Sequence, residues 1–445
     1  MIKRITVLGG GPGGYTAAIR GAQQGAQVTI IEHTSFGGTC LNWGCIPTKA
    51  YVESVHQGEK DLKTIKERKR GIVEQLVGGV KMLLEKNKVE IINGRGRVIS
   101  PREVEVELAD GSKKIVENDT LILATGSKTF NLPLPGMDSS RVLDSKDILD
   151  LEKVPESLAV IGGGVIGMEL AQIFAQLGTK VTVIEMLPKI LANLDEELVR
   201  RIQPVLKKEG IEILTGTKVT GIKETESGLE VSVSGKKDAV ISAEYVLAAA
   251  GRVPNLDGID FESLGLEMER RFIKVDNMLK TNLPDVYAIG DLTSSPMLAH
   301  VASYEGEVAV QAIFGSKKGA NYEAVPACVY THPELAGVGI TENQAKEKGL
   351  EYKVGKFPFT ANGRALTQGA NYGMVKIIGD ANTGKILGAH ILGPSASELI
   401  HELTLAVRWG LTVEQVAETI HAHPTLAEAI LEASHGVFGK PVHAL

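Results

Sequence analysis

A pattern of strand, glycine loop, helix and strand occurs twice in this sequence, and this repeat limits the possible folds more than any other feature. The first copy consists, in order, of an apolar run at residues 5–8, then Gly9, Gly11, Gly14 and Glu32. The second consists of an apolar run at residues 158–161, then Gly162, Gly164, Gly167 and Glu185. The acid follows the first glycine at the same distance in both copies, 32 − 9 = 23 and 185 − 162 = 23 residues.

Each copy has the parts of a dinucleotide-binding fingerprint. The first glycine allows a tight turn, the second lets a pyrophosphate approach the backbone, and the third lets the helix pack on the strand. The helix N-terminus stabilises the phosphate charge, and the acid accepts hydrogen bonds from ribose hydroxyls. A single copy would be weak evidence, because glycine is common in turns. Two copies in register predict two bound dinucleotides, one flavin and one pyridine nucleotide.

Glu185 also bears on the choice of nicotinamide cofactor. A carboxylate there pairs with a free 2′-hydroxyl and repels the 2′-phosphate of NADP. No arginine lies in residues 186–191 to bind such a phosphate. The second fingerprint therefore predicts NAD.

Length and composition exclude several classes of protein. A chain of 445 residues has room for about three domains. Hydrophobic residues make up 43% and charged residues 23%, which is typical of globular proteins. The 48 Lys and Arg against 54 Asp and Glu give a net charge of −6, which disfavours general nucleic-acid binding. Because no apolar run reaches about 18 residues, we expect no membrane span and a cytoplasmic location.

Two of the three cysteines, Cys40 and Cys45, lie close together after the first fingerprint. Four intervening residues can bring both sulfurs together at the start of a helix, where the dipole and Lys49 favour thiolate. Two buried structural cysteines are the alternative. A metal site needs more ligands, and no Cys or His cluster stands beside the pair, so we expect none. Beside a flavin-type fingerprint, a redox-active dithiol is favoured. Cys328 lies in an apolar run and is expected in the core.

The segment from Gly37 to Lys49 resembles the active-site signature of the FAD- and NAD(P)-dependent disulfide oxidoreductases. Other stretches that resemble this family are residues 124–127, 250–255, 287–291, 297–300 and 421–428. The resemblance implies an α/β fold with two Rossmann-like dinucleotide-binding domains, for FAD and NAD, and a C-terminal α+β dimerisation domain. The boundaries that we expect are 1–138 (FAD), 139–257 (NAD), 258–320 (completing the FAD domain) and 321–445 (interface).

The resemblance also implies cofactor contacts. Asp291 would hold the ribityl chain of FAD, and Arg252 would lie near the nicotinamide. The segment along the isoalloxazine would be Met297, Leu298, Ala299 and His300. The other contacts implied by the family are Gly96, Thr125, Gly126, Ser127, Val219 and Gly251.

The catalytic roles come from the same resemblance. Cys40, as the more accessible sulfur, would exchange with the substrate, and Cys45, nearer the flavin, would form the charge-transfer thiolate. Thiol exchange needs a base. That base would be His423, oriented by Glu428, acting on the dithiol of the other subunit of a homodimer. Lys49 would lie near flavin N5 and pair with Glu169.

Within the family, the sequence is most similar to the dihydrolipoamide dehydrogenases. Glutathione reductases carry arginines near the position of Glu185, and residues 439–445 lack the terminal thiols of mercuric reductases. Trp43 and Thr48 are mild departures from the family pattern. The implied reaction is oxidation of protein-bound dihydrolipoamide and reduction of NAD⁺. The implied partners are the lipoyl domains and subunit-binding domain of the acyltransferase core of 2-oxo-acid dehydrogenase complexes, or the lipoyl protein of glycine cleavage.

Two alternatives stay open. One is a related NAD(P)H-dependent disulfide reductase of the glutathione- or mercuric-reductase type, which Glu185 disfavours. The other is a flavoprotein that acts as a binding or assembly subunit with vestigial catalysis. The presence of Cys40, Cys45 and His423 argues against it.

Overall fold

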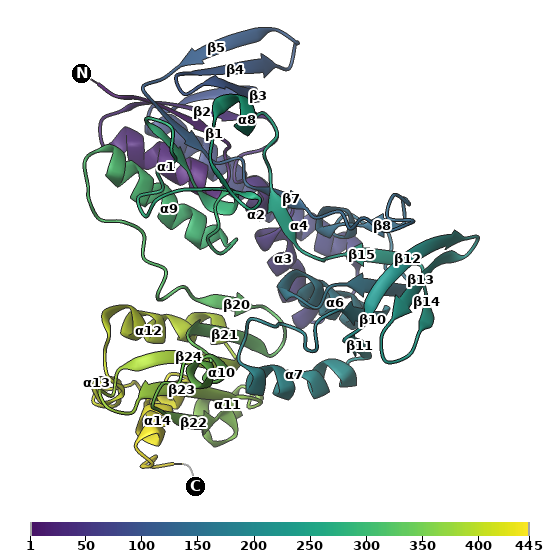
Figure 1. The fold of residues 1–445 in the computed structure, drawn as a ribbon. Coiled ribbons are helices and arrows are strands. Elements are labelled where there is room, and N and C mark those ends of the chain that lie inside the picture. Colours follow the sequence, from purple (N-terminus) through teal and green to yellow (C-terminus); the bar gives the residue numbers. More distant parts are fainter. Residues whose placement is uncertain (1, 444–445) are drawn as a thin grey trace.

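The structure is a computed structural model and describes residues 2–443; Met1 and the last two residues of the cysteine-free tail, 444–445, lie outside the described part. The chain forms three units (Figure 1): a unit with the first glycine loop, to which a later segment returns, a unit with the second loop, and a C-terminal unit. The first two contain parallel β-sheets, and the third has an antiparallel sheet covered by helices. The expected fold class is confirmed.

The first unit is built on a seven-stranded sheet with the order β19-β6-β1-β2-β3-β4-β5. Its parallel strands are β1 (Arg4–Leu8), β2 (Gln27–Glu32), β6 (Thr120–Leu123) and β19 (Val286–Ala288), together with the first part of β3 (Glu90–Ser100). An antiparallel extension consists of the rest of β3, β4 (Glu103–Leu108) and β5 (Lys113–Glu117). The nearly continuous apolar runs of β1 and β6 are typical of strands buried on both faces. Because β19 pairs with β6, a late segment of the chain completes this sheet.

The helices of the first unit carry the dithiol segment. They are α1 (Pro12–Gln23), α2 (Gly38–Asn42), α3 (Cys45–His56), α4 (Leu62–Lys86), α8 (Phe261–Leu264), η1 (Gly290–Leu292) and α9 (Ala299–Ile313). The short strands β17 (Met268–Glu269) and β18 (Phe272–Ile273) form a ribbon. α1 and α9 pack closely, since a Cβ at Gly13 would lie 2.9 Å from the carbonyl oxygen of Ala302.

The second unit repeats the plan with a five-stranded parallel sheet of order β11-β10-β9-β15-β8. Its strands are β8 (Val142–Leu143), β9 (Ser157–Ile161), β10 (Lys180–Glu185), β11 (Ile211–Thr215) and β15 (Tyr245–Ala248). Its helices are α5 (Ser145–Ile148), α6 (Val165–Leu177) and α7 (Glu196–Lys208). A three-stranded antiparallel sheet packs beside it, with β12 (Lys218–Thr225), β13 (Gly228–Ser234) and β14 (Ala239–Ala243). The ribbon of β7 (Ser127–Thr129) and β16 (Arg252–Pro254) pairs the ends of the two nucleotide units.

The C-terminal unit has an antiparallel sheet of order β20-β21-β24-β23-β22. Its strands are β20 (Ala327–Val329), β21 (Glu334–Gly339), β22 (Tyr352–Pro358), β23 (Met374–Asp380) and β24 (Ile386–Gly393). Its helices are α10 (Glu342–Glu347), η2 (Phe359–Ala361), α11 (Gly363–Thr367), α12 (Ala396–Trp409), α13 (Val413–Ala417) and α14 (Glu428–Val437). Within residues 2–443, no helix is both long and apolar enough to cross a membrane.

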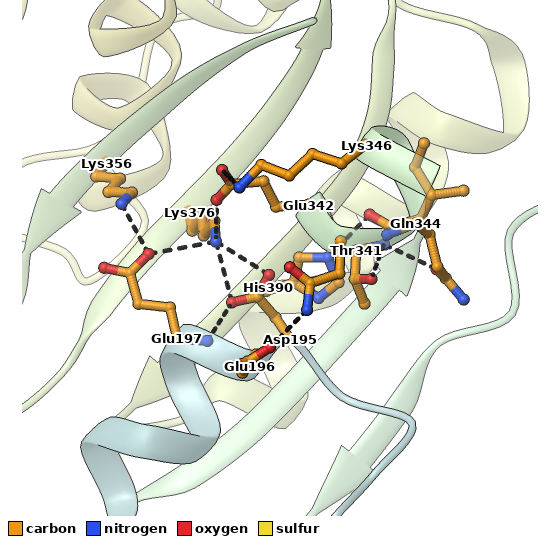
Figure 2. A network of polar contacts seen from close by, with 12 residues as sticks. Asp195, Glu196, Glu197, Thr341, Glu342, Gln344, Lys346, Lys356, Lys376 and His390 are labelled. Atoms are coloured by element: carbon orange, nitrogen blue, oxygen red, sulfur yellow. Dashed lines mark hydrogen bonds and ion pairs between the residues drawn. The ribbon is translucent and has the colours of Figure 1, made fainter. Parts of the chain in front are cut away.

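A buried ion network ties the second unit to the C-terminal unit (Figure 2). Asp195 caps the N-terminus of α7 by accepting a hydrogen bond from the backbone N–H of Glu197 at 3.1 Å. The carboxylates of Asp195 and Glu197 both lie beside the ammonium of Lys376, which extends from β23 and is 1% exposed. This network is the polar part of a junction that also contains apolar contacts, and it holds α7 against the antiparallel sheet.

Candidate active site

The first glycine loop connects β1 to α1 in the way that its spacing predicts. Gly9 has φ +109°, a value that L side chains rarely adopt, and a Cβ on Gly14 would lie 1.9 Å from the carbonyl oxygen of Gly9. Both positions therefore require glycine. Gly11 differs, because nothing lies within 4 Å of the Cβ that it lacks. It is the N-cap of α1 and provides no side-chain cap, so free N–H groups face open space at the positive end of the helix.

The second loop repeats this geometry at β9 and α6. Gly162 has φ +110°, and a Cβ on Gly167 would lie 2.0 Å from the carbonyl oxygen of Gly162. Gly164 is the uncapped N-cap of α6 and also faces open space. Each loop thus offers unpaired N–H groups and room at the place where a pyrophosphate would bind.

The two fingerprint acids close their loops in the same way. Glu32 Oε2 accepts a hydrogen bond from the N–H of Gly10 at 2.7 Å, and Glu185 Oε2 accepts one from the N–H of Gly163 at 2.6 Å. The N–H of Leu187 donates to Glu185 Oε1 at 2.7 Å. A carboxylate oxygen can accept two hydrogen bonds. Oε2 of Glu32 and both oxygens of Glu185 therefore keep the capacity to accept from a ribose hydroxyl.

The two cysteines of the signature lie on consecutive helices. Cys40 belongs to α2, and Cys45 is the first residue of α3; both are free thiols. A hydrogen bond from the Cys40 thiol lowers the pKa of Cys45 to about 7, and the nearby Lys49 ammonium adds to this effect. The same hydrogen bond, together with burial, raises the pKa of Cys40. Of the two sulfurs, Cys45 is therefore the one that ionises first.

As whole residues, Cys45 is exposed and Cys40 is half-buried in the protein chain. The expectation that the Cys40 sulfur is the one that exchanges with the substrate stays a prediction.

Lys49 and Glu169 form the pair that the resemblance implied. Lys49 Nζ, from α3, donates to Glu169 Oε2, from α6, at 2.8 Å, and Glu169 is 3% exposed. Lys49 lies four residues after Cys45, so the two side chains share one face of α3. The sequence reasoning missed Tyr330, whose ring centroid lies 4.4 Å from Lys49 Nζ. In the sequence, Tyr330 is only the last residue of the apolar run 327–330, and no local pattern marks it as part of a site.

A second polar cluster joins the ribbon between the nucleotide units to η1. Ser127 Oγ donates to Asp291 Oδ2 at 2.5 Å, and Arg252 Nε donates to Ser127 Oγ at 2.7 Å. Arg252 also donates to the carbonyl oxygen of Ser127 at 2.6 Å. Asp291 Oδ1 has no hydrogen-bond partner within residues 2–443, so it can accept from a hydroxyl such as those of a ribityl chain.

The remaining cofactor contacts implied by the resemblance lie at the ends of elements or in the core. Leu298 is the N-cap of α9, which begins at Ala299, and Met297 precedes it; His300 Nε2 lies 3.0 Å from the carbonyl oxygen of Pro326. Thr125 Oγ1 donates to the carbonyl oxygen of Asn255 at 2.6 Å. Gly126 and Gly251 have positive φ values of +72° and +119°.

Gly96 and Val219 make close internal contacts. A Cβ on Gly96 would lie 2.4 Å from Leu8 Cδ1, so a larger residue here would displace the buried side chain of Leu8. Val219 is 5% exposed and belongs to the hydrophobic core around β10 and β12. Its side chain faces the core, which leaves only its backbone for a nucleotide.

The two histidines of the C-terminal segment have different partners. His423 Nδ1 lies 2.8 Å from Glu428 Oε1, and its ring is 80% exposed. Glu428 Oε2 accepts from the N–H of Thr425 at 2.8 Å, which fixes the carboxylate. His421 instead pairs with Glu402 at 2.9 Å, and its side chain is 5% exposed. Only His423 presents a free ring nitrogen to the surface.

Comparison with known proteins agrees with this geometry. Residues 3–306 match the family described as pyridine nucleotide-disulphide oxidoreductase, and residues 325–434 match the dimerisation domain of the same family. This chain belongs to the pyridine nucleotide-disulphide oxidoreductases. The cofactors of the family relatives are FAD and NAD(H), and the two uncapped glycine loops fit two dinucleotides. No group of three or more potential metal ligands occurs within residues 2–443.

Several relatives within this oxidoreductase family are similar over nearly their full length. A dihydrolipoyl dehydrogenase from Geobacillus stearothermophilus is 42% identical, with 99% of this chain and 97% of the relative covered. A mitochondrial dihydrolipoyl dehydrogenase from Arabidopsis thaliana is 41% identical, with 99% and 91% covered. Two solved structures are less similar in sequence: the flavoprotein disulfide reductase RclA from Escherichia coli and LpdA from Mycobacterium tuberculosis. Each has a TM-score of 0.91, is 28% identical, and is covered over 99% of its length by 98% of this chain.

Proposed function

We propose that this oxidoreductase is a dihydrolipoamide dehydrogenase, which oxidises protein-bound dihydrolipoamide to lipoamide and passes the two electrons through FAD to NAD⁺. The observation that carries the proposal is the placement of Cys40 and Cys45 on the consecutive helices α2 and α3, with the Lys49–Glu169 ion pair one turn after Cys45. The relatives at 41–42% identity over the full chain support the substrate.

The cysteine pair would act by thiol–disulfide exchange. A lipoyl thiolate attacks Cys40 Sγ of the Cys40–Cys45 disulfide, which forms a mixed disulfide and releases Cys45 as thiolate. The second lipoyl thiol then displaces Cys40, so lipoamide leaves oxidised and the enzyme holds two thiols. The depressed pKa of Cys45 makes it the better leaving group. Bound FAD supplies the route for the two electrons from this dithiol to NAD⁺. Exchange at Cys40 requires that bound flavin cover Cys45.

His423 would remove the proton of the attacking lipoyl thiol. Its Nδ1 is held by Glu428, so Nε2 is free for the substrate. The segment between α13 and α14 lies in the C-terminal unit, well away from α2, which lies near the middle of the molecule (Figure 1). His423 therefore acts on the dithiol of a second subunit, and the match of residues 325–434 to a dimerisation domain supports a homodimer.

The remaining assignments follow the sequence predictions. We assign residues 1–138 with 258–320 to FAD, 139–257 to NAD, and 321–445 to the subunit interface. The partners would be lipoyl domains and the subunit-binding domain of an acyltransferase core, or the lipoyl protein of glycine cleavage, in the cytoplasm. Met297, His300, Gly96 and the ribbon residues around Arg252 would contact the cofactors.

The test is NAD⁺ reduction by dihydrolipoamide, measured on FAD-loaded wild type, on Cys45→Ser and on Cys328→Ser as the matched control. We expect turnover in the wild type and the control, and its loss in Cys45→Ser. Absence of turnover in an FAD-loaded wild-type dimer would overturn the proposal. The second candidate, a reductase of another disulfide, is favoured only by the fold similarity to RclA at 28% identity. NADPH oxidation with other disulfides would identify it.

A further inference from the structure

Tyr330 touches both members of the ion pair beside the dithiol. Its ring centroid lies 4.4 Å from Lys49 Nζ, within the distance at which an aromatic face attracts an ammonium. Its backbone N–H donates to Glu169 Oε1 at 2.9 Å, while Lys49 holds the other oxygen, Oε2, at 2.8 Å. One residue that follows β20 thus contacts the charged groups from α3 and α6.

The backbone around Tyr330 is fixed by two buried side chains of α6. Glu169 and Gln172 are one turn apart and are 3% and 4% exposed. Gln172 accepts from the N–H of His332 at 2.7 Å and donates to the carbonyl oxygen of the same residue at 2.8 Å. Together with the bond to Glu169, three hydrogen bonds clamp this segment to α6. Buried polar groups left unpaired are costly, so the clamp holds the ring in place.

Tyr330 contacts the Lys49 ammonium with its aromatic ring and not with its hydroxyl group. Tyr330 Oη has no hydrogen bond to any other residue in the described part of the chain, and the side chain is half-buried. A lysine side chain has several rotatable bonds and would otherwise sample positions away from α6. Two contacts, one to a carboxylate and one to an aromatic face, restrict the ammonium to the face of α3 that carries Cys45.

We propose that Tyr330 is a positioning residue for the redox centre, whose ring and backbone N–H together hold the Lys49–Glu169 pair so that the ammonium stays beside the Cys45 sulfur. The proposal rests on the proposed function in one respect, since it takes the Cys45 thiolate as one of the two redox-active sulfurs. It assigns to a residue of the dimerisation domain a part in the charge balance of the dithiol.

A titration of Cys45 reports the combined effect of all charged and titratable groups around the dithiol. Those that act on Cys45 are Cys40 from α2, Lys49 from its own helix, Glu169 from α6 and Arg252 from β16. Those that act on Tyr330 and its surroundings are Cys328, Glu334, Glu169 and Glu398. Loss of the ring leaves the Lys49–Glu169 ion pair in place but removes one of the two contacts that hold the ammonium, so the cation is less restricted to the side of the thiolate while the carboxylate stays.

The experiment measures the pH dependence of the charge-transfer absorbance between the Cys45 thiolate and the flavin in the dithiol-reduced, FAD-loaded enzyme without nucleotide or lipoamide. This absorbance reports Cys45 and not Cys40, and it does not require a reagent to reach a sulfur that the flavin covers. The variants are Tyr330→Phe, Tyr330→Leu, and Tyr330 replaced by phenylalanines with one to three ring fluorines. Fluorination weakens the negative ring face at nearly constant size.

We expect Tyr330→Phe to titrate as the wild type and Tyr330→Leu to raise the apparent pKa of Cys45 by about half a unit to one unit. The fluorinated series should raise it progressively. If Tyr330→Leu fails to fold, that series still decides the question. Equal titration of Cys45 across the series and the wild type would overturn the proposal. Since no substrate is present, this outcome is independent of whether the enzyme oxidises dihydrolipoamide.

Discussion

The ammonium of Lys376 lies 3.0 Å from Asp195 Oδ2 across the junction of the second nucleotide unit and the C-terminal unit, with side-chain exposures of 1% and 2% (Figure 2). Glu342 and Glu197 complete the surroundings of the ammonium at 2.8 and 3.2 Å. A lysine this deeply buried keeps its charge because three carboxylates replace water around it.

Removal of Lys376 should be strongly destabilising. Lys376→Met leaves Asp195 buried without its counter-charge, and breaking a buried pair in this way costs about 3–5 kcal/mol. The denaturant midpoint of the apo-protein, followed by circular dichroism, checks this. Lys274→Met is the control, because Lys274 and Glu267 form a pair at 2.7 Å with side chains 60% and 54% exposed, and such pairs contribute about 0–1 kcal/mol. Similar shifts for the two variants would contradict the expectation.

The same network should make stability fall in acid. The hydrogen bond from Lys376 lowers the pKa of Glu342 to about 2; for Glu197, burial opposes ionisation, but Lys356 and Lys376 outweigh it and also lower the pKa to about 2. A depressed carboxylate pKa stabilises the folded state above the unfolded value of 4.5, and this contribution is lost as the pH falls towards 2. Thermal midpoints should therefore decline below about pH 4.5, and less steeply in Glu342→Gln. An identical slope in that variant would speak against the assignment.

The thiolate character of Cys45 should depend on Cys40. Because the hydrogen bond from the Cys40 thiol is the largest cause that lowers the pKa of Cys45 to about 7, Cys40→Ala should move it towards the ordinary value of 9.0. Alkylation of Cys45 at pH 7, measured on the FAD-free protein in which no flavin covers the sulfur, should then slow. Cys328→Ala, which changes the third thiol, should leave the rate unchanged. Unaltered alkylation in Cys40→Ala would show that the thiolate is stabilised by other groups.

His423 and His421 offer a matched test of the base. General acid–base catalysis typically contributes about 10²–10⁴-fold, so His423→Gln should lower kcat with dihydrolipoamide by about that factor. Glu428→Gln should have a smaller effect, since it removes the charge that orients the ring. His421→Gln, which removes the pair with Glu402, should change kcat little. Equal losses in both histidine variants would point to a general disturbance of the segment.

Two alanine substitutions in the second glycine loop separate the role of its glycines in packing from their role in the approach of the ligand. Gly164→Ala should leave the fold and FAD content intact but weaken NAD⁺ binding, because the added Cβ meets only open space in the chain. Gly167→Ala places a Cβ 2.0 Å from the carbonyl oxygen of Gly162 and should destabilise the second unit itself. FAD absorbance, NAD⁺ titration and thermal midpoints separate the two effects. Tight NAD⁺ binding by Gly164→Ala would contradict the role of this loop.

The local features of this protein follow from sequence alone. The glycine loops, their acids and the Cys45–Lys49 spacing lie within single βαβ units or one helical turn, where backbone geometry fixes which residues meet. The His423–Glu428 contact is similarly local, since five residues separate its members.

Only the tertiary structure decided the contacts between distant segments. Lys49 and Glu169 are 120 residues apart, and Tyr330 lies 161 residues after Glu169. The family resemblance implied the first contact, but no pattern of hydrophobicity or charge predicted Tyr330 or the Asp195–Lys376 pair. Periodicity specifies which face of an element is buried, while the partner of a buried polar group depends on how whole units pack against one another.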